Sequence, residues 1–143
     1  MAYRRIHFKG GYRYEEADTY GTVYPGMLVK LNSSGYIIPH DEEGGRGEVA
    51  FALEDALQGA AVGTAYTSGE LGRYILPEKG GEVCAMLKTG ETVAVGDELV
   101  SDGSGHLQAR GSSGSGLTEW QTIAIAMEAV TSTANDLMRV RVV

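Results

Sequence analysis

Glycine spacing is the feature of this sequence that most restricts its fold. The chain contains 21 glycines among 143 residues, and they recur every few positions, so the apolar runs between them are too short for long helices. Short apolar runs bounded by glycine are typical of strands and turns. We therefore predict an all-β fold with strands over eight segments: 27–31, 36–39, 49–53, 71–76, 83–87, 98–100, 121–127 and 137–143.

The last segment shows the alternation expected of a half-buried strand. In Met-Arg-Val-Arg-Val at 138–142, apolar residues alternate with arginines, which gives one apolar face and one solvated face. Helix propensity alone would allow a short helix over 53–58, but Gly59 and Gly63 restrict it to a turn or two. We expect a strand that ends at Leu53, followed by a turn.

An internal repeat divides the chain into two similar parts. Val-Tyr-Pro-Gly at 23–26 matches Val-Ala-Val-Gly at 93–96, an offset of 70. Val-Ala-Phe-Ala-Leu-Glu at 49–54 matches Ile-Ala-Ile-Ala-Met-Glu at 123–128, an offset of 74. The four additional residues fall in the loop Gly-Ser-Ser-Gly-Ser-Gly at 111–116, which we interpret as a tolerated insertion.

Two copies of one β unit have a simple physical explanation. A unit of about four short strands cannot bury its apolar face alone, and a second copy supplies the missing cover. We expect the halves, about 23–76 and 83–143, to share one core in a small β-barrel or β-sandwich, so that 23–143 forms a single domain. Residues 1–22 precede the repeat and are expected to form an extended N-terminal arm.

The N-terminal segment also differs from the rest of the chain in charge. Residues 1–14 carry four cations and no acid, so they contribute +4 and the total of −7 leaves −11 for the remainder. Tyr and Arg are enriched at protein interfaces, which favours docking over the alternative of a frayed terminus. A chain that begins near Gly21 should then fold but lose binding. The candidate interface residues are Tyr3, Arg4, Arg5, Phe8, Lys9, Tyr12, Arg13 and Tyr14.

No motif indicates catalysis, a cofactor or a metal site. His7, His40 and His106 lie far apart, without metal-ligand spacing, and there is no nucleophile elbow or phosphate-binding loop with its lysine. Glu54 and Glu128 recur at equivalent positions after a strand, which could suggest a catalytic carboxylate pair. A duplicated residue more often has the same structural part twice. We therefore expect no enzyme activity.

Cysteine usage and charge restrict the environment and the partners. Cys84 lies in the apolar run Val-Cys-Ala-Met-Leu at 83–87, which predicts a buried, unreactive thiol. No stretch approaches the roughly 20 apolar residues of a membrane span, and the N-terminus lacks a hydrophobic signal core, so we expect no membrane partner and a reducing, aqueous compartment. The net charge of −7 argues against nucleic acid as a partner.

Several of these motifs occur together in one known family. Val-x-x-Gly-x-x-Val from Val23, the segment 49–54, Val-Ala-Val-Gly-Asp-Glu-Leu-Val-Ser-Asp-Gly at 93–103 and the segment 124–128 resemble the capsid decoration, or cement, proteins of tailed bacteriophages. The resemblance extends from Val23 to Val143. The first half departs from the pattern at Met27, where the second half has Asp97.

The resemblance implies a non-catalytic virion protein that is made in the host cytoplasm and binds the outer surface of the capsid. Its expected partners are the major capsid protein and two further copies of itself in a homotrimer, and its expected role is to stabilise the shell. Two alternatives remain open. One is an accessory β-barrel domain of an enzyme, with the catalytic groups on a partner chain. The other is a ligand- or carbohydrate-recognising virion module, which would be favoured if one exposed face were shared by Tyr24, Tyr36, Tyr66, Tyr74 and Trp120.

Overall fold

The computed structural model describes residues 3, 5–45, 47–111 and 120–143. Its regular structure within these ranges is β-strand, apart from one 3-10 turn, η1 (Ala56–Gln58), and this confirms the all-β prediction. The 3-10 turn lies where a turn was expected after the strand near Leu53, and it ends at Gly59, whose φ of 74° is left-handed. None of the helical structure in the described part of the chain is long and apolar enough to cross a membrane.

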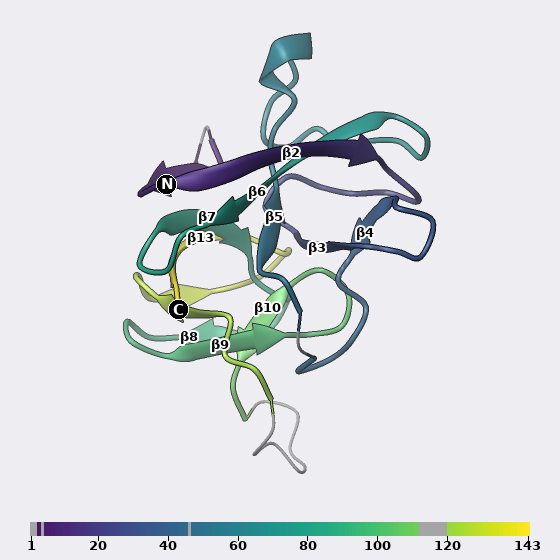
Figure 1. Ribbon diagram of the computed structural model, residues 1–143. Coiled ribbons are helices and arrows are strands. Elements are labelled where there is room, and N and C mark those ends of the chain that lie inside the picture. Colours follow the sequence, from purple (N-terminus) through teal and green to yellow (C-terminus); the bar gives the residue numbers. More distant parts are fainter. Residues whose placement is uncertain (1–2, 4, 46, 112–119) are drawn as a thin grey trace.

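The first sheet contains five antiparallel strands in the order β2-β6-β5-β3-β4 and occupies the upper half of Figure 1. Its longest pairing joins β2 to β6 over seven residues, from Tyr12 opposite Pro77 to Asp18 opposite Leu71. Thr19, directly after β2, forms a parallel bridge with Ile37, so the sheet curls toward closure. The strands are β2 (Tyr12–Asp18), β3 (Leu28–Leu31), β4 (Ile37–Pro39), β5 (Ala50–Ala52) and β6 (Leu71–Pro77).

The second sheet repeats this arrangement and adds one strand. Its order is β1-β7-β13-β11-β9-β10, and Leu87, directly after β7, forms a parallel bridge with Leu107. The strands are β1 (His7–Lys9), β7 (Glu82–Met86), β9 (Glu98–Ser101), β10 (Leu107–Ala109), β11 (Ala124–Ala126) and β13 (Leu137–Val142). A separate pair, β8 (Thr92–Val93) with β12 (Val130–Thr131), lies beside this sheet.

The strand order in the two sheets follows the sequence repeat. We call residues 12–77 the first unit and residues 82–142 the second unit. All eight segments predicted as strands contain one, whereas β1, β2, β8, β10 and β12 were not expected. Because β2 is the counterpart of β7, the repeated unit begins before Val23, and β2 belongs to a sheet instead of a separate arm.

The same turn chemistry closes the equivalent hairpins of the two units. Asn32 Oδ1 accepts the backbone N–H groups of Ser34 and Tyr36, at 2.9 and 3.0 Å. Asp102 Oδ1 likewise accepts those of Ser104 and His106, at 2.7 and 3.0 Å. In both turns, the side-chain oxygen thus supplies hydrogen-bond partners for backbone N–H groups.

One hydrophobic core includes residues from both units, as the repeat predicted. A cross-strand row of the first sheet, Leu28 opposite Phe51 and Phe51 opposite Ile75, is fully buried and packs in this core. The corresponding row of the second sheet is Glu98, Ile125 and Arg141, and its two ends are exposed. The opposite face of the first sheet buries a smaller cluster that includes Val29, Ala50 and Tyr74.

The two units therefore contact each other through different surfaces. The β9–β10 hairpin of the second unit lies on the first unit, where Leu28 donates its N–H to Gly105 O at 2.8 Å and Gly105 donates to His40 O at 3.0 Å. A Cβ at Gly105 would lie 3.0 Å from Pro39 Cβ, whereas a Cβ at Gly35, the equivalent glycine, would meet open space. The stacking is head to tail, without a two-fold relation.

We predict that Phe51→Ala destabilises the protein by about 3–5 kcal/mol, because a fully buried ring shared by both units leaves a cavity. Ile125→Ala, at the equivalent but half-buried position, is the matched control and should cost less than half as much. Urea unfolding of both variants measures the difference. Equal losses would contradict the assignment of Phe51 to the boundary between the units.

Acid should weaken this boundary through His40, which is buried with Nδ1 2.7 Å from Ser101 Oγ. Burial, and next the charge of Lys30, lowers the pKa of His40 below its usual 6.5. The unfolded chain then binds the proton more tightly, so stability is highest above about pH 6.5 and falls as the pH drops toward the folded-state pKa. We expect His40→Asn to flatten the decline between about pH 7.5 and 5.5 in urea unfolding. An unchanged slope would rule His40 out as its cause.

Candidate interaction surface

The N-terminal segment is anchored at the boundary between the two units. Ile6 is fully buried in the main core. Its carbonyl accepts the N–H of Cys84 at 2.7 Å, and its own N–H donates to Glu54 Oε2 at 3.0 Å. The hydroxyl of Tyr3 donates to Glu128. The two repeated glutamates thus both bind the segment that precedes β1, which gives them the same structural part.

The anchored segment leaves most of the predicted interface residues at the surface. Phe8, Tyr12 and Tyr14 are 39%, 45% and 42% exposed, and Arg5, Lys9 and Arg13 are exposed as well. Tyr3 is half-buried, and Arg4 lies outside the described residues. β1 and β2 therefore present aromatic and cationic side chains to solvent, but on two sheets of the fold.

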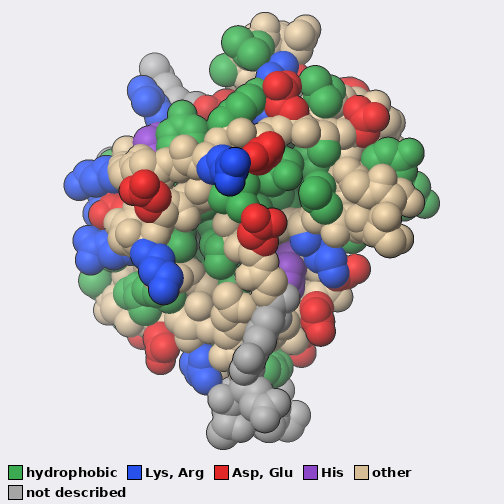
Figure 2. Space-filling view, viewed as in Figure 1, with side chains coloured by type: hydrophobic (Ala, Val, Ile, Leu, Met, Phe, Trp, Pro, Cys, Tyr) green, Lys and Arg blue, Asp and Glu red, His purple; other side chains and the backbone are tan. Residues whose placement is uncertain are grey.

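Phe8 belongs to a basic patch on the second sheet. The guanidinium of Arg139 lies 5.1 Å from the centre of the Phe8 ring, and Lys9 Nζ lies 5.8 Å from it, within the range of cation–π attraction. Glu82, nearly buried, pairs with Arg139 at 3.4 Å and with Arg141 at 3.3 Å. In Figure 2, Lys and Arg side chains gather on the left of the view, where the N-terminus is marked in Figure 1.

Tyr14 belongs instead to a charged network on the first sheet. Arg73 Nη1 donates to the Tyr14 hydroxyl at 2.5 Å and to Glu16 Oε2 at 2.8 Å, while Arg73 Nε donates to Asp55 Oδ1 at 2.8 Å. Hydrogen bonding to Asp55, and next to Tyr14, raises the pKa of Arg73 above its usual value. One arginine thus joins β2 and β6 to the segment that leads into η1.

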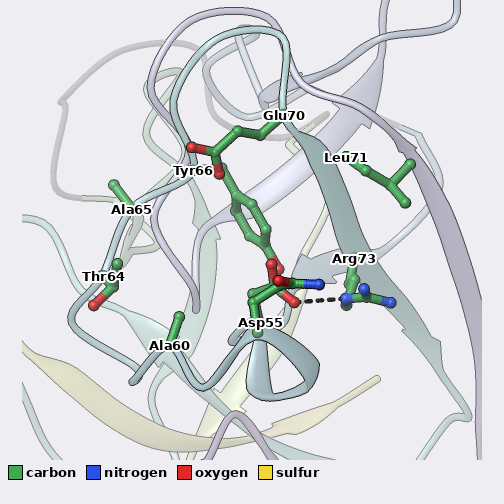
Figure 3. A pocket seen from close by; sticks show the side chains of 9 residues that line it. Asp55, Ala60, Thr64, Ala65, Tyr66, Glu70, Leu71 and Arg73 are labelled. Atoms are coloured by element: carbon green, nitrogen blue, oxygen red, sulfur yellow. Dashed lines mark hydrogen bonds and ion pairs between the residues drawn. The ribbon is translucent and has the colours of Figure 1, made fainter.

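A pocket of about 460 Å³ lies beside this network, between β6 and the loop that follows η1 (Figure 3). Several of its polar side chains have hydrogen-bond partners: Asp55 pairs with Arg73, the Tyr66 hydroxyl donates to Leu53 O at 2.7 Å, and Glu70 accepts from Thr67. Burial raises the pKa of Tyr66 above its usual value. The carboxylates of Asp55 and Glu70 are thus engaged by Arg73 and Thr67.

The remaining reactive side chains are dispersed. Cys84 is fully buried, as predicted, and burial followed by the nearby charge of Glu128 raises the pKa of its thiol to about 12. His7 contacts Gly10 O and His106 contacts Asp102, so each histidine has a different local partner. Among the described residues, no three His, Cys, Asp or Glu side chains form a cluster that could hold a metal ion.

The structure does not provide the single aromatic face that would favour a carbohydrate-recognising module. Tyr66 and Tyr74 are only 2% and 8% exposed, whereas Tyr24 and Tyr36 are each 40% exposed. Tyr36 instead stacks on Tyr20, with ring centres 6.4 Å apart, a contact between distant residues that no sequence pattern indicated. The loop interpreted as an insertion lies, except for Gly111, outside the described residues.

No protein-family model matches the sequence, and no curated protein matches it. Among solved structures, the chain is similar to the head fiber gp8.5 N base of bacteriophage phi29, with a TM-score of 0.59. The match covers 93% of this chain and 95% of that chain at 12% sequence identity. At this identity the likeness shows that the two chains share a fold.

The structure reverses the expectation for a chain that begins at Gly21. Such a chain lacks Ile6, which fills the core, and β2, which pairs with β6 over seven residues. We predict loss of a cooperative thermal transition, measured by circular dichroism, whereas a chain that begins at Tyr3 should retain it. A cooperative melt of the shorter chain would mean that the first 20 residues are dispensable for folding.

Proposed function

We propose that this chain is a structural protein of a phage virion that binds the outer surface of the capsid and stabilises the shell. The observation that carries the proposal is the fold shared with a phage head fiber base over nearly the full length of both chains. The resemblance of the repeat motifs to phage capsid decoration proteins supports the same class of function.

The surface described above is suited to binding a protein. Exposed Phe8, Tyr12 and Tyr14 supply apolar contact area. Exposed Arg5, just before β1, and exposed Arg13 on β2 add positive charge. Aromatic residues and arginine are the types most enriched at binding hot spots. A cement protein needs such contacts to join neighbouring shell subunits, and it needs no catalytic group. The absence of enzyme activity remains part of the proposal.

Co-sedimentation tests the proposal directly. The purified protein should sediment with expanded capsids of its phage and less with unexpanded procapsids, because a decoration protein recognises the surface that expansion creates. Equal recovery with both shells, or with neither, would count against a stabilising role.

We propose that the protein acts as a homotrimer, on the basis of the family resemblance and of strand edges that an assembly would cover. Light scattering after size exclusion should give the mass of three chains. A monomer both in solution and at capsid-saturating concentration would refute this part of the proposal.

We predict that Arg5→Ala combined with Arg13→Ala weakens capsid binding roughly threefold to tenfold, as expected for exposed charges. The loss should shrink as salt rises and the Debye length falls below about 10 Å. Lys30→Ala with Lys88→Ala removes the same charge elsewhere and is the matched control. If the control weakens binding as much, net charge accounts for the effect and the β1–β2 surface does not.

A further inference from the structure

One sheet edge is covered in the second unit and uncovered in the first. β7 is the edge strand of the repeated arrangement, and β1 lies along it. Cys84 donates its N–H to Ile6 O, and Met86 donates to Gly26 O at 2.9 Å. The counterpart of β7 in the first unit is β2, which is the outermost strand of its sheet (Figure 1).

The register shows which backbone groups of β2 point outward. Glu78 donates to Gly11 O at 3.0 Å and Thr19 donates to Glu70 O at 2.8 Å, so the ladder at both ends of β2 uses odd-numbered residues. Antiparallel bonding alternates along a strand, which leaves the even-numbered residues facing away from β6. These outward residues are Tyr12, Tyr14, Glu16 and Asp18.

Equivalent positions in the two units can be compared directly. In the strand register, Tyr14 lies opposite Ile75 in the first unit and Glu82 lies opposite Arg141 in the second unit. Because Ile75 and Arg141 are equivalent, Tyr14 corresponds to Glu82. Two and four residues further on, Glu16 corresponds to Cys84 and Asp18 corresponds to Met86. Within the described part of the chain, no backbone or side-chain acceptor is hydrogen-bonded to the N–H of Glu16 or Asp18. In the second unit, Ile6 covers the edge at Cys84 and Gly26 of the first unit covers it at Met86. Among the described residues, no segment takes either place in the first unit, where β4 contacts the edge only through the bridge from Thr19 to Ile37.

A groove of about 440 Å³ lies beside the uncovered edge. It is lined by Tyr14, Glu16, Leu53, Ala56, Leu57 and Arg73, among others. Leu57 is 76% exposed, the highest value among the large apolar side chains at the described surface. At the covered edge, the apolar side chain of Ile6 is buried beside the strand. The groove offers a comparable place for an apolar side chain.

The charges beside the edge favour a basic occupant. β2 carries Glu15, Glu16 and Asp18, and Glu54 lines the groove. Arg13 pairs with Glu15 and Arg73 pairs with Glu16, so four acids against two arginines leave a net charge of −2. The segment that covers β7 is itself basic and has one apolar residue in the core. Like charges placed opposite one another destabilise strand pairs, whereas opposite charges stabilise them.

We propose that the edge of β2 binds an extended, basic segment of the shell protein as an added strand, with one apolar side chain in the adjacent groove. This inference rests on the proposed function for the identity of the partner. Its physical basis is general: extended segments bind exposed sheet edges through main-chain hydrogen bonds, and side-chain pockets supply selectivity.

Hydrogen exchange followed by NMR tests the edge without any capsid. The probe is a peptide of residues 3–10 of this chain, which contains Ile6 and three cations. Because β1 already occupies the edge of β7, the peptide should slow amide exchange at Tyr12, Tyr14, Glu16 and Asp18, with little change at the odd-numbered residues. The same peptide with Ile6→Asp is the control and should protect these amides much less. Unchanged exchange at all four amides, or protection along β7 instead, would overturn the proposal.

Asp18→Pro removes one outward N–H, and proline is accepted on an edge strand where the N–H faces solvent. We expect peptide binding and capsid binding to weaken roughly fivefold, the loss of about one backbone hydrogen bond. Asp18→Ala keeps the N–H and should have a smaller, salt-sensitive effect. If Asp18→Pro does not fold, the exchange pattern of the unaltered protein still decides the matter.

The two proposals can fail separately. If the protein sediments with expanded capsids and Asp18→Pro binds them equally well, the function stands and the strand-addition site is overturned. If the protein does not sediment with capsids but the peptide protects the four amides, the edge is a strand-binding site whose partner is not a shell protein.

Discussion

Burial of one face of the first sheet against the second unit is the constraint on which the rest of the structure depends. Leu28, Phe51 and Ile75 are fully buried there, and each such side chain contributes roughly 1.5–3 kcal/mol when removed from water. Together they stabilise the fold by an amount comparable to the net stability of a typical domain, roughly 5–15 kcal/mol. The first unit has apolar residues on both faces of its sheet, and one of these faces is buried in the core that it shares with the second unit.

The N-terminal segment follows from the same constraint. Where the units meet, Tyr3 and Ile6 supply hydrogen-bond partners for the backbone N–H of Cys84 and for the carboxylates of Glu54 and Glu128. Ile6 fills the remaining space in the core. Anchoring this segment leaves its aromatic and cationic neighbours exposed, so a single stretch of chain both completes the fold and presents the surface that we assign to binding.

Much of this fold could be predicted from the sequence, and the parts that could not have physical reasons. In segments such as 137–143, apolar and polar residues alternate because one face of the strand is buried. This alternation is a strong local signal for a strand. β2 has no such signal: Tyr-Arg-Tyr-Glu-Glu-Ala-Asp lies at a sheet edge and is largely exposed, so polarity matches an arm as well as a strand. β7, its counterpart, is apolar because it is covered, and the two strands share little beyond Ala17 and Ala85. The exposure of Tyr12 and Tyr14 was foreseeable, whereas the burial of Ile6 among polar residues depends on tertiary contacts.

The row formed by Glu98, Ile125 and Arg141 has a consequence for how a duplicated protein keeps its size. A unit that stacks on its copy through two different surfaces could in principle go on adding copies and form a fibre. Repeat proteins limit such growth with terminal units whose outer face is polar. Here, Glu98 and Arg141 lie where the first unit has Leu28 and Ile75. A third unit packed on this row would therefore have to bury the charges of Glu98 and Arg141. The charged row therefore gives the second unit an outer face that disfavours the addition of a further unit in the same way.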